Sequence, residues 1–266
     1  MARILFLGQR PLGETCFQLC LDHQAVEILG ASSNSTKNGW WRTNGIYTAC
    51  SKYGITFVDN SHRNEDDLLK LIVNLRIDTI FSVQHCWILS NDILNSVSGR
   101  AFNLHMAKLP EYKGHYPFAH AILNDENQYT VTLHWMSPKV DSGLIAYTGT
   151  FPISKADTAY DLYRRACKAS VEIFMCLLDD IAKDRTPPTT KMTGEPKFYS
   201  RNSLSPQECI IDMGDEREVD LKSRALFFPP FTPAYGYVGS RRVFVLPERL
   251  GEFEQCNLFK RGDASQ

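Results

Sequence analysis

The first 105 residues alternate short apolar runs with amphipathic segments, and this alternation leaves few folds open to the chain. Runs of strand length occur at residues 4–7, 26–31, 55–58, 78–83 and 101–104. Helical patterns lie between them, at residues 12–21, 47–53, 65–75 and 92–97. Strands that alternate with helices form parallel sheets with right-handed crossovers. The sequence therefore predicts an α/β fold with a doubly wound, mostly parallel sheet.

The second half of the chain has a different pattern. Residues 130–136 and 144–153 resemble β-strands, and residues 157–181 form one long amphipathic helical pattern. Asp157 or Thr158 is expected to cap this helix, because both side chains accept hydrogen bonds from backbone N–H groups.

The C-terminal part is rich in turn-forming residues. Residues 184–205 contain many Pro, Thr and Lys residues and are expected to cross the molecule as an extended segment. Short patterns follow from Glu208 onward and favour a small β-containing C-terminal appendage. We expect a main domain at residues 1–184, with the extended segment and a small subdomain at residues 185–266.

Charge and cysteine content limit the partners and the compartment. The 266 residues include 29 basic and 30 acidic side chains, so the chain lacks the basic excess typical of nucleic-acid binding. Eight cysteines form no CxxC pair, which favours buried thiols in a reducing compartment and no metal site. No segment approaches the about 20 apolar residues of a membrane span. A cytoplasmic protein without nucleic-acid or membrane partners is expected.

Asn103 and His105 lie at the end of the predicted strand at residues 101–104 and project from the same face, since they are two residues apart. Ligands gather at the carboxyl ends of parallel strands. An amide N–H there would stabilise an oxyanion, and an imidazole would donate to it or move protons. By itself, N-x-H is also compatible with a structural asparagine and histidine at a turn.

Asp141 precedes Ser142 and Gly143, a small and turn-prone pair, after the predicted strand at residues 130–136. A carboxylate that reached the imidazole would orient it and accept a proton from an amine. Considered alone, Asp-Ser-Gly indicates only a turn.

Together these residues give the order N-x-H-x-x-x-L-P-x-Y-(K/R)-G followed by D-x-G. This order resembles the formyltransferases that use N10-formyltetrahydrofolate, over the chain from the first strand to about residue 153. The resemblance implies a Rossmann-like catalytic domain in which Asn103, His105 and Asp141 form the catalytic triad. Residues 103–107 resemble the sugar N-formyltransferase branch. Lys113 stands where many relatives carry Arg, and so keeps the charge without the bidentate geometry.

In the family that this chain resembles, the loop after the strand at residues 78–83 holds the pterin ring, largely through backbone groups. A flat heterocycle suits such a slot with apolar walls, which Trp87 and Ile88 would supply. Ordinary core packing is the alternative for Trp87, and His85 has no identified partner. The expected folate contacts are Val83, Gln84, His85, Cys86, Trp87, Ile88, Met136 and Val140.

Aromatic side chains beside basic ones in the tail suit a nucleotide, because bases stack on rings and a diphosphate pairs with arginine. A hydrophobic clamp between appendage and main domain is the alternative.

The turn at residues 8–13 lacks the sequence patterns of NAD and ATP sites. Arg10 in this turn would either meet a phosphate or be solvated. The expected acceptor contacts are Arg10, Lys113, Arg201, Arg224, Phe227, Phe228, Phe231 and Tyr235.

The sequence therefore leads to one main hypothesis. By resemblance, the chain transfers a formyl group to a nucleotide-linked amino sugar, such as a dTDP-4-amino-4,6-dideoxyhexose, in the synthesis of bacterial surface polysaccharides (the O-antigen of lipopolysaccharide). A homodimer is expected from the resemblance only. The alternatives are a methionyl-tRNA or other amine formyltransferase, a formyltetrahydrofolate hydrolase and a binding protein without activity.

Overall fold

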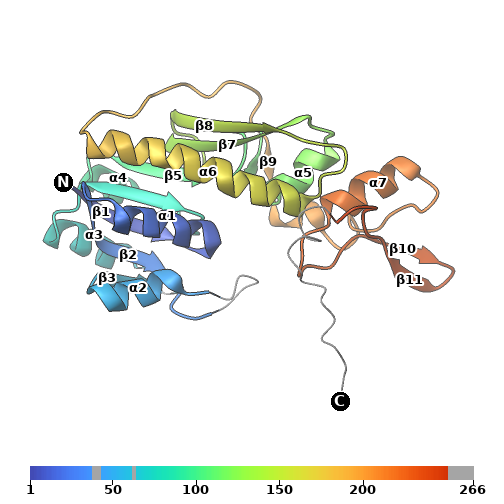
Figure 1. Cartoon of the computed structure of the whole chain (residues 1–266), viewed down its shortest axis with the longest axis horizontal. Coiled ribbons are helices and arrows are strands. Elements are labelled where there is room, and N and C mark those ends of the chain that lie inside the picture. Colours follow the sequence, from blue (N-terminus) through green and yellow to red (C-terminus); the bar gives the residue numbers. More distant parts are fainter. Residues whose placement is uncertain (38–42, 62–63, 251–266) are drawn as a thin grey trace, which may run out of the picture. The chain divides into compact units, whose positions relative to one another are not determined.

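The structure is a computed structural model that describes residues 1–37, 43–61 and 64–250. Its main feature is a seven-stranded sheet in the order β3-β2-β1-β4-β5-β7-β8 (Figure 1). Parallel pairs join β1 to β2, β2 to β3, β1 to β4 and β4 to β5, whereas β5 and β7 are antiparallel. The strands are β1 (Ala2–Gly8), β2 (Val26–Ser33), β3 (Thr56–Asp59), β4 (Thr79–Val83), β5 (Ala101–His105), β7 (Gln128–Trp135) and β8 (Ile145–Pro152). The predicted doubly wound, mostly parallel α/β sheet is confirmed.

Helices cover both faces of the sheet, and alternate strand residues pack against them. Leu5 and Leu7 join a buried cluster with side chains from α3 and α4. On the opposite face, Phe6 packs on Phe17 of α1, with ring centroids 5.2 Å apart, and Phe81 packs on Phe174 of α6 at 5.4 Å. The helices are α1 (Arg10–Asp22), α2 (Gly45–Tyr53), α3 (Glu65–Asn74), α4 (Asn91–Ser96) and α6 (Ala159–Ala182), all of them predicted from the sequence.

The start of α6 is fixed by a reciprocal pair of hydrogen bonds. Thr158 Oγ1 accepts from the Asp161 backbone N–H at 3.2 Å, and the Asp161 carboxylate accepts from the Thr158 N–H at 2.9 Å. This is a capping box, which satisfies N–H groups that have no partner inside the helix. Of the two predicted caps, the structure selects Thr158.

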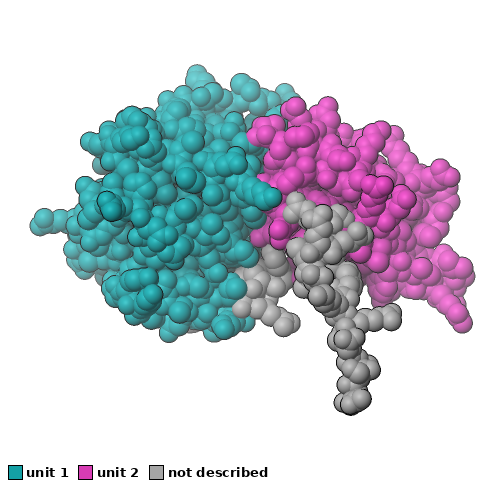
Figure 2. All heavy atoms as spheres, in the orientation of Figure 1, with its two compact units in different colours: residues 1–111, 130–149, 167–196 teal, residues 112–129, 150–166, 197–266 magenta. Residues whose placement is uncertain are grey.

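The chain forms two compact units (Figure 2). Unit 1 comprises residues 1–111, 130–149 and 167–196, and unit 2 comprises residues 112–129, 150–166 and 197–266. The chain passes between the units several times, so neither is a continuous segment. The sequence-based boundary at residue 184 stays a prediction. No helix in the part of the chain that the structure describes is both long and apolar enough to cross a membrane.

Unit 2 holds small elements, of which the sequence predicted only part. A two-stranded antiparallel sheet of β10 and β11 confirms the β-containing appendage. The sequence analysis missed α7, a short helix of strongly polar composition. Asp215 caps it by accepting hydrogen bonds from the N–H groups of Arg217 and Glu218. The elements are β6 (Lys113–Gly114), α5 (Pro117–Leu123), β9 (Phe198–Tyr199), η1 (Arg201–Leu204), α7 (Glu216–Ala225), β10 (Tyr235–Val238) and β11 (Arg241–Phe244).

Candidate active site

Asn103 and His105 lie on β5, two residues apart and therefore on one face of the sheet. The antiparallel partner strand β7 places His134 opposite Asn103 and Thr132 opposite His105. Residues opposite each other on antiparallel strands have neighbouring side chains. The pairing therefore brings a second imidazole beside the Asn103 amide.

Asp141 reaches this face from the loop between β7 and β8. Its backbone has a φ of 48°, in the left-handed region. Gly143 lies against β7 so closely that a Cβ atom there would be 1.6 Å from the Trp135 carbonyl oxygen. The Trp135 N–H also donates to the Leu144 carbonyl at 2.8 Å. The loop is thus held against the strand, and Asp141 is directed toward the histidines.

The Asp141 carboxylate lies between two imidazoles. Oδ2 is 3.7 Å from His105 Nδ1, and Oδ1 is 3.7 Å from His134 Nε2. The side chains of Asp141 and His105 are 12% and 14% exposed. Little water therefore screens the carboxylate, and its interactions with the imidazoles are stronger than they would be at the surface. Both distances exceed the length of a hydrogen bond.

His134 was not among the residues assigned from the sequence, and its contacts place it inside the cluster. Its Nε2 is 3.1 Å from Asn103 Nδ2, and its Nδ1 is 2.8 Å from the Trp135 carbonyl oxygen. Because side chains alternate along a strand, the sequence showed only that His134 shares a face with Thr132 and Met136. The pairing of β7 with β5 is what places His134 beside Asn103. The sequence alone therefore could not predict that His134 belongs to the site.

The cluster has the groups needed for acyl transfer to an amine. The Asn103 amide carries two N–H donors, an imidazole either donates or accepts a proton, and a carboxylate accepts one. Donors fixed before the reaction stabilise a developing oxyanion well, because they need not reorganise. The structure thus brings together the three residues predicted as the triad, while their catalytic roles stay predictions.

The loop after β4 contains buried polar atoms without a partner among the described residues, namely Gln84 Oε1 and His85 Nε2. Burial lowers the pKa of the His85 imidazole to about 3, so this ring is neutral. His85 Nδ1 accepts from the Trp87 N–H at 3.3 Å, which leaves the hydrogen on Nε2. Exposed Cys86 and Ile88 follow in the same loop. Unsatisfied polar atoms beside apolar side chains fit a hydrogen-bonding heterocycle such as a pterin.

The other expected folate contacts differ in burial. Trp87 is 9% exposed, packs in the core cluster with Leu89, and donates its indole N–H to the Asn60 carbonyl at 3.1 Å. These contacts favour the core-packing alternative for Trp87. Met136 packs against the same cluster, Val83 is fully buried, and Val140 is exposed. The folate role of all these residues stays a prediction.

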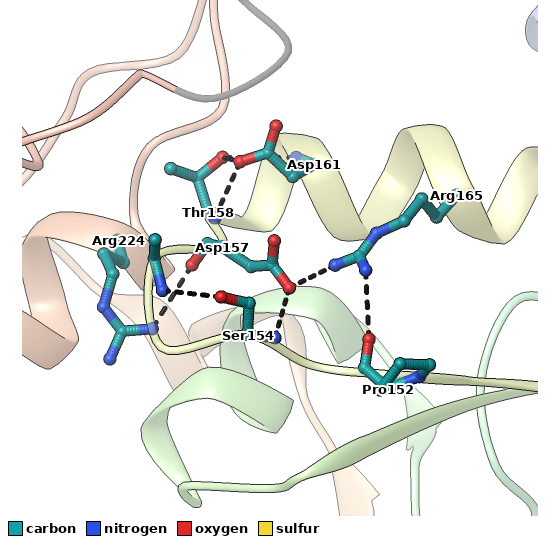
Figure 3. A network of polar contacts seen from close by, with 8 residues as sticks. Pro152, Ser154, Asp157, Thr158, Asp161, Arg165 and Arg224 are labelled. Carbon is teal, nitrogen blue, oxygen red and sulfur yellow. Dashed lines mark hydrogen bonds and ion pairs between the residues drawn. The ribbon is translucent and has the colours of Figure 1, made fainter.

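Arg224, predicted to meet a diphosphate, is buried in a network of unit 2 (Figure 3). Its guanidinium donates to both carboxylate oxygens of Asp220, at 3.0 and 2.6 Å, and to the Asp157 carbonyl at 3.2 Å. The Asp157 carboxylate also receives hydrogen bonds from Arg165 and from the Ser154 N–H. These contacts favour a structural role for Arg224.

The predicted aromatic contacts are divided between core and surface. Phe227 and Tyr235 are both buried, and the Tyr235 hydroxyl donates to the Pro206 carbonyl at 3.0 Å. Phe228 packs edge-on against Tyr160 and Tyr163. Phe231 is 58% exposed, and so offers a ring face to a ligand.

The remaining predicted acceptor contacts are basic and lie apart in the chain. Arg10 is exposed at the first position of α1, with a φ of 66°. Lys113 is half-buried on β6, where its N–H donates to the Lys197 carbonyl at 3.0 Å. Arg201 is exposed at the start of η1. Their part in acceptor binding stays a prediction.

The close approach of Gly143 to β7 gives a first prediction. We expect Gly143→Ala to lower the free energy of unfolding by about 3 kcal/mol, because the added methyl group overlaps backbone that cannot move easily. Chemical denaturation measures the change. Gly54→Ala is the control, since its site is open but left-handed, and it should cost only about 1–2 kcal/mol. Equal losses for the two variants would contradict the tight packing of this loop.

Solved structures with the same fold are numerous among formyl-transferring enzymes. A sugar 3N-formyl transferase crystallised with dTDP and 5-N-formyl-THF is 24% identical, with 86% of this chain and 80% of that chain covered and a TM-score of 0.67. An N-formyltransferase from Helicobacter canadensis, in complex with folinic acid and dTDP-3-aminofucose, is 21% identical over 90% and 85%, with a TM-score of 0.70. A 4-N formyltransferase from Francisella tularensis is 20% identical over 94% and 99%, with a TM-score of 0.75. At these identities the likeness shows the fold.

Membership of a family follows from the sequence itself. The protein-family model described as Formyl transferase matches residues 3–178, which is well over half of the 266 residues. The matched segment includes Asn103, His105 and Asp141, the cluster described above. The chain therefore belongs to the formyl transferase family.

Proposed function

We propose that this enzyme transfers a formyl group from N10-formyltetrahydrofolate to the amine of a nucleotide-linked amino sugar. The observation that carries the proposal is the half-buried cluster of Asn103, His105 and Asp141 at the carboxyl end of β5, in a chain of the formyl transferase family. The folate supplies an activated formyl group when it is bound. The loop after β4 and the loop that carries Asp141 would hold it.

Each residue of the cluster has a distinct proposed task. Asn103 donates an N–H to the oxygen of the formyl group as it becomes an oxyanion, and the His105 imidazole supports it. Asp141 accepts the proton that the attacking amine must lose. The bond between the formyl carbon and N10 then breaks, and N10 takes up one proton, so that tetrahydrofolate and the formamido sugar are the products. The partly buried position of the cluster strengthens these interactions, since little water competes for them.

A nucleotide-linked sugar is the proposed acceptor because two kinds of observation agree. Relatives with the same fold were crystallised with dTDP and with dTDP-3-aminofucose. The tail of this chain offers the exposed ring of Phe231 and the exposed Arg201, groups that suit a base and a diphosphate. The proposal has three finer parts. The acceptor is a dTDP-4-amino-4,6-dideoxyhexose, the reaction belongs to the synthesis of bacterial surface polysaccharides, and the enzyme is located in the cytoplasm.

The reaction is tested by measuring tetrahydrofolate release from N10-formyltetrahydrofolate with a panel of nucleotide-linked 3-amino and 4-amino sugars. The proposal expects release that requires one sugar, with a formamido product of the matching mass. Folate release without any amine would instead identify a hydrolase. Activity with an aminoacylated tRNA alone, or with none of the amines, would reject the sugar acceptor.

Asn103→Ala should lower kcat by about 10²–10³-fold, because one donor to the oxyanion is lost. Steady-state kinetics with the sugar identified above measures this effect. Asn74→Ala removes an exposed amide from α3 in unit 1 and should leave kcat unchanged. A normal kcat for Asn103→Ala would remove Asn103 from the mechanism.

Phe231→Ala should raise the KM for the nucleotide sugar about tenfold with little change in kcat, since stacking of one base on an aromatic ring contributes about 1–3 kcal/mol. The control is Tyr53→Ala, which removes an aromatic ring that is 54% exposed on α2. The KM for the folate serves as an internal reference and should not change. An unaltered KM for the sugar would exclude Phe231 from the acceptor site.

A homodimer joined through β10 and β11 is part of the proposal. The hairpin exposes the apolar side chains of Tyr237, Val238, Val243 and Phe244, which a second copy of the chain would bury. Sedimentation velocity should show a dimer that Val238→Asp converts to monomer. Val73→Asp, an equally exposed site on α3, should leave the dimer intact. A monomeric wild-type protein would contradict this part.

A further inference from the structure

We infer that His134 is a positioning residue that fixes the orientation of the Asn103 carboxamide. The kinetic test of this inference rests on the proposed function, but the position of the hydrogen on the His134 ring can be tested without turnover. His134 lies opposite Asn103 across the β5–β7 pair, and its side chain is only 3% exposed. Its two ring nitrogens have different partners, and these partners determine what the ring can do.

The first step concerns the position of the ring hydrogen. His134 Nδ1 is 2.8 Å from the Trp135 carbonyl oxygen, and a carbonyl oxygen only accepts hydrogen bonds. Nδ1 must therefore carry a hydrogen. In the neutral imidazole the other nitrogen, Nε2, then has a lone pair and needs a donor.

The second step concerns which neighbour supplies that donor. The Asp141 carboxylate, 3.7 Å from Nε2, has no hydrogen to donate when it is ionised. The Asn103 amide nitrogen is 3.1 Å from Nε2 and has two. The NH₂ group must therefore point toward His134, since the amide oxygen in that place would oppose the lone pair. The tautomer of the buried His134 ring thus determines that the Asn103 amide turns its NH₂ group, and not its oxygen, toward His134.

The third step is the consequence for the reaction. The second hydrogen of the Asn103 NH₂ group stays available to the oxyanion of the proposed mechanism. The terminal torsion of asparagine is broad and roughly two-fold, so an unrestrained amide would also place its oxygen toward the oxyanion. That orientation is repulsive. His134 would act through Asn103 without touching the substrates.

The kinetic test compares His134→Leu with His134→Gln. Leu has no acceptor, and kcat should fall about tenfold, as expected for losing one buried hydrogen bond, while the KM values of both substrates change less than twofold. Gln places an amide oxygen near the position of Nε2 and should restore kcat to within about threefold of wild type. A drop in kcat that Gln does not restore would overturn the inference.

A double-mutant cycle separates positioning from general damage. In the Asn103→Ala background, His134→Leu should lower kcat less than twofold further, because the amide that it orients is gone. The control Tyr147→Phe removes a hydroxyl on β8 that donates a hydrogen bond to the Asp180 carboxylate. This control should keep kcat within twofold. A His134→Leu effect of the same size in both backgrounds would show a merely structural role.

A spectroscopic measurement on the wild-type protein needs neither turnover nor a folded variant. A long-range ¹H–¹⁵N correlation NMR spectrum of protein with ¹⁵N-labelled histidine should show His134 as the neutral tautomer with its hydrogen on Nδ1. Finding the hydrogen on Nε2 would overturn the inference whatever the substrate is. If this tautomer is found but no sugar supports turnover, the proposed function fails and the positioning of Asn103 stands.

Discussion

In the central sheet, β7 runs antiparallel to β5, and its register places His134 across from Asn103 and Thr132 across from His105. The other strand pairs from β3 to β5 are parallel, so this pair is where the sheet changes direction. A shift of register by one residue would turn His134 to the opposite face. The amide and both imidazoles share one face because this register is held, and the position of Asp141 depends on it as well.

Backbone contact explains how the carboxylate reaches the same place. The loop that carries Asp141 lies on β7 at Gly143, where there is no room for a side chain. A loop fixed in this way holds a charge at a defined distance from two rings without a covalent link. The low exposure of Asp141 and His105 strengthens the attraction between the carboxylate and the imidazole, because electrostatic interactions are stronger where water is excluded.

The tail of the chain shows how composition can suggest several roles at once. Arg224 and Phe231 both belong to the stretch that combines basic and aromatic residues, yet the first is buried and the second exposed. Asp220 lies four residues before Arg224 on α7, which allows a bidentate ion pair within one helix. That pair and the Asp157 carbonyl satisfy the guanidinium, whereas the ring of Phe231 keeps an accessible face. Burial therefore separates residues that the sequence placed in one group.

Periodicity alone determined the α/β class, the strands and helices of the first 105 residues, and the long helix that Thr158 caps. These features follow from contacts close in sequence and from the requirement that apolar faces be buried. The family motif also predicted that Asn103, His105 and Asp141 act together, and the structure brings these residues to one place, while their roles stay predictions. Only the tertiary structure decided that His134 meets Asn103, that Trp87 packs in the core and that Arg224 is paired. Each of these depends on which distant residue becomes a neighbour, and strand register and burial set that choice only when the chain has folded.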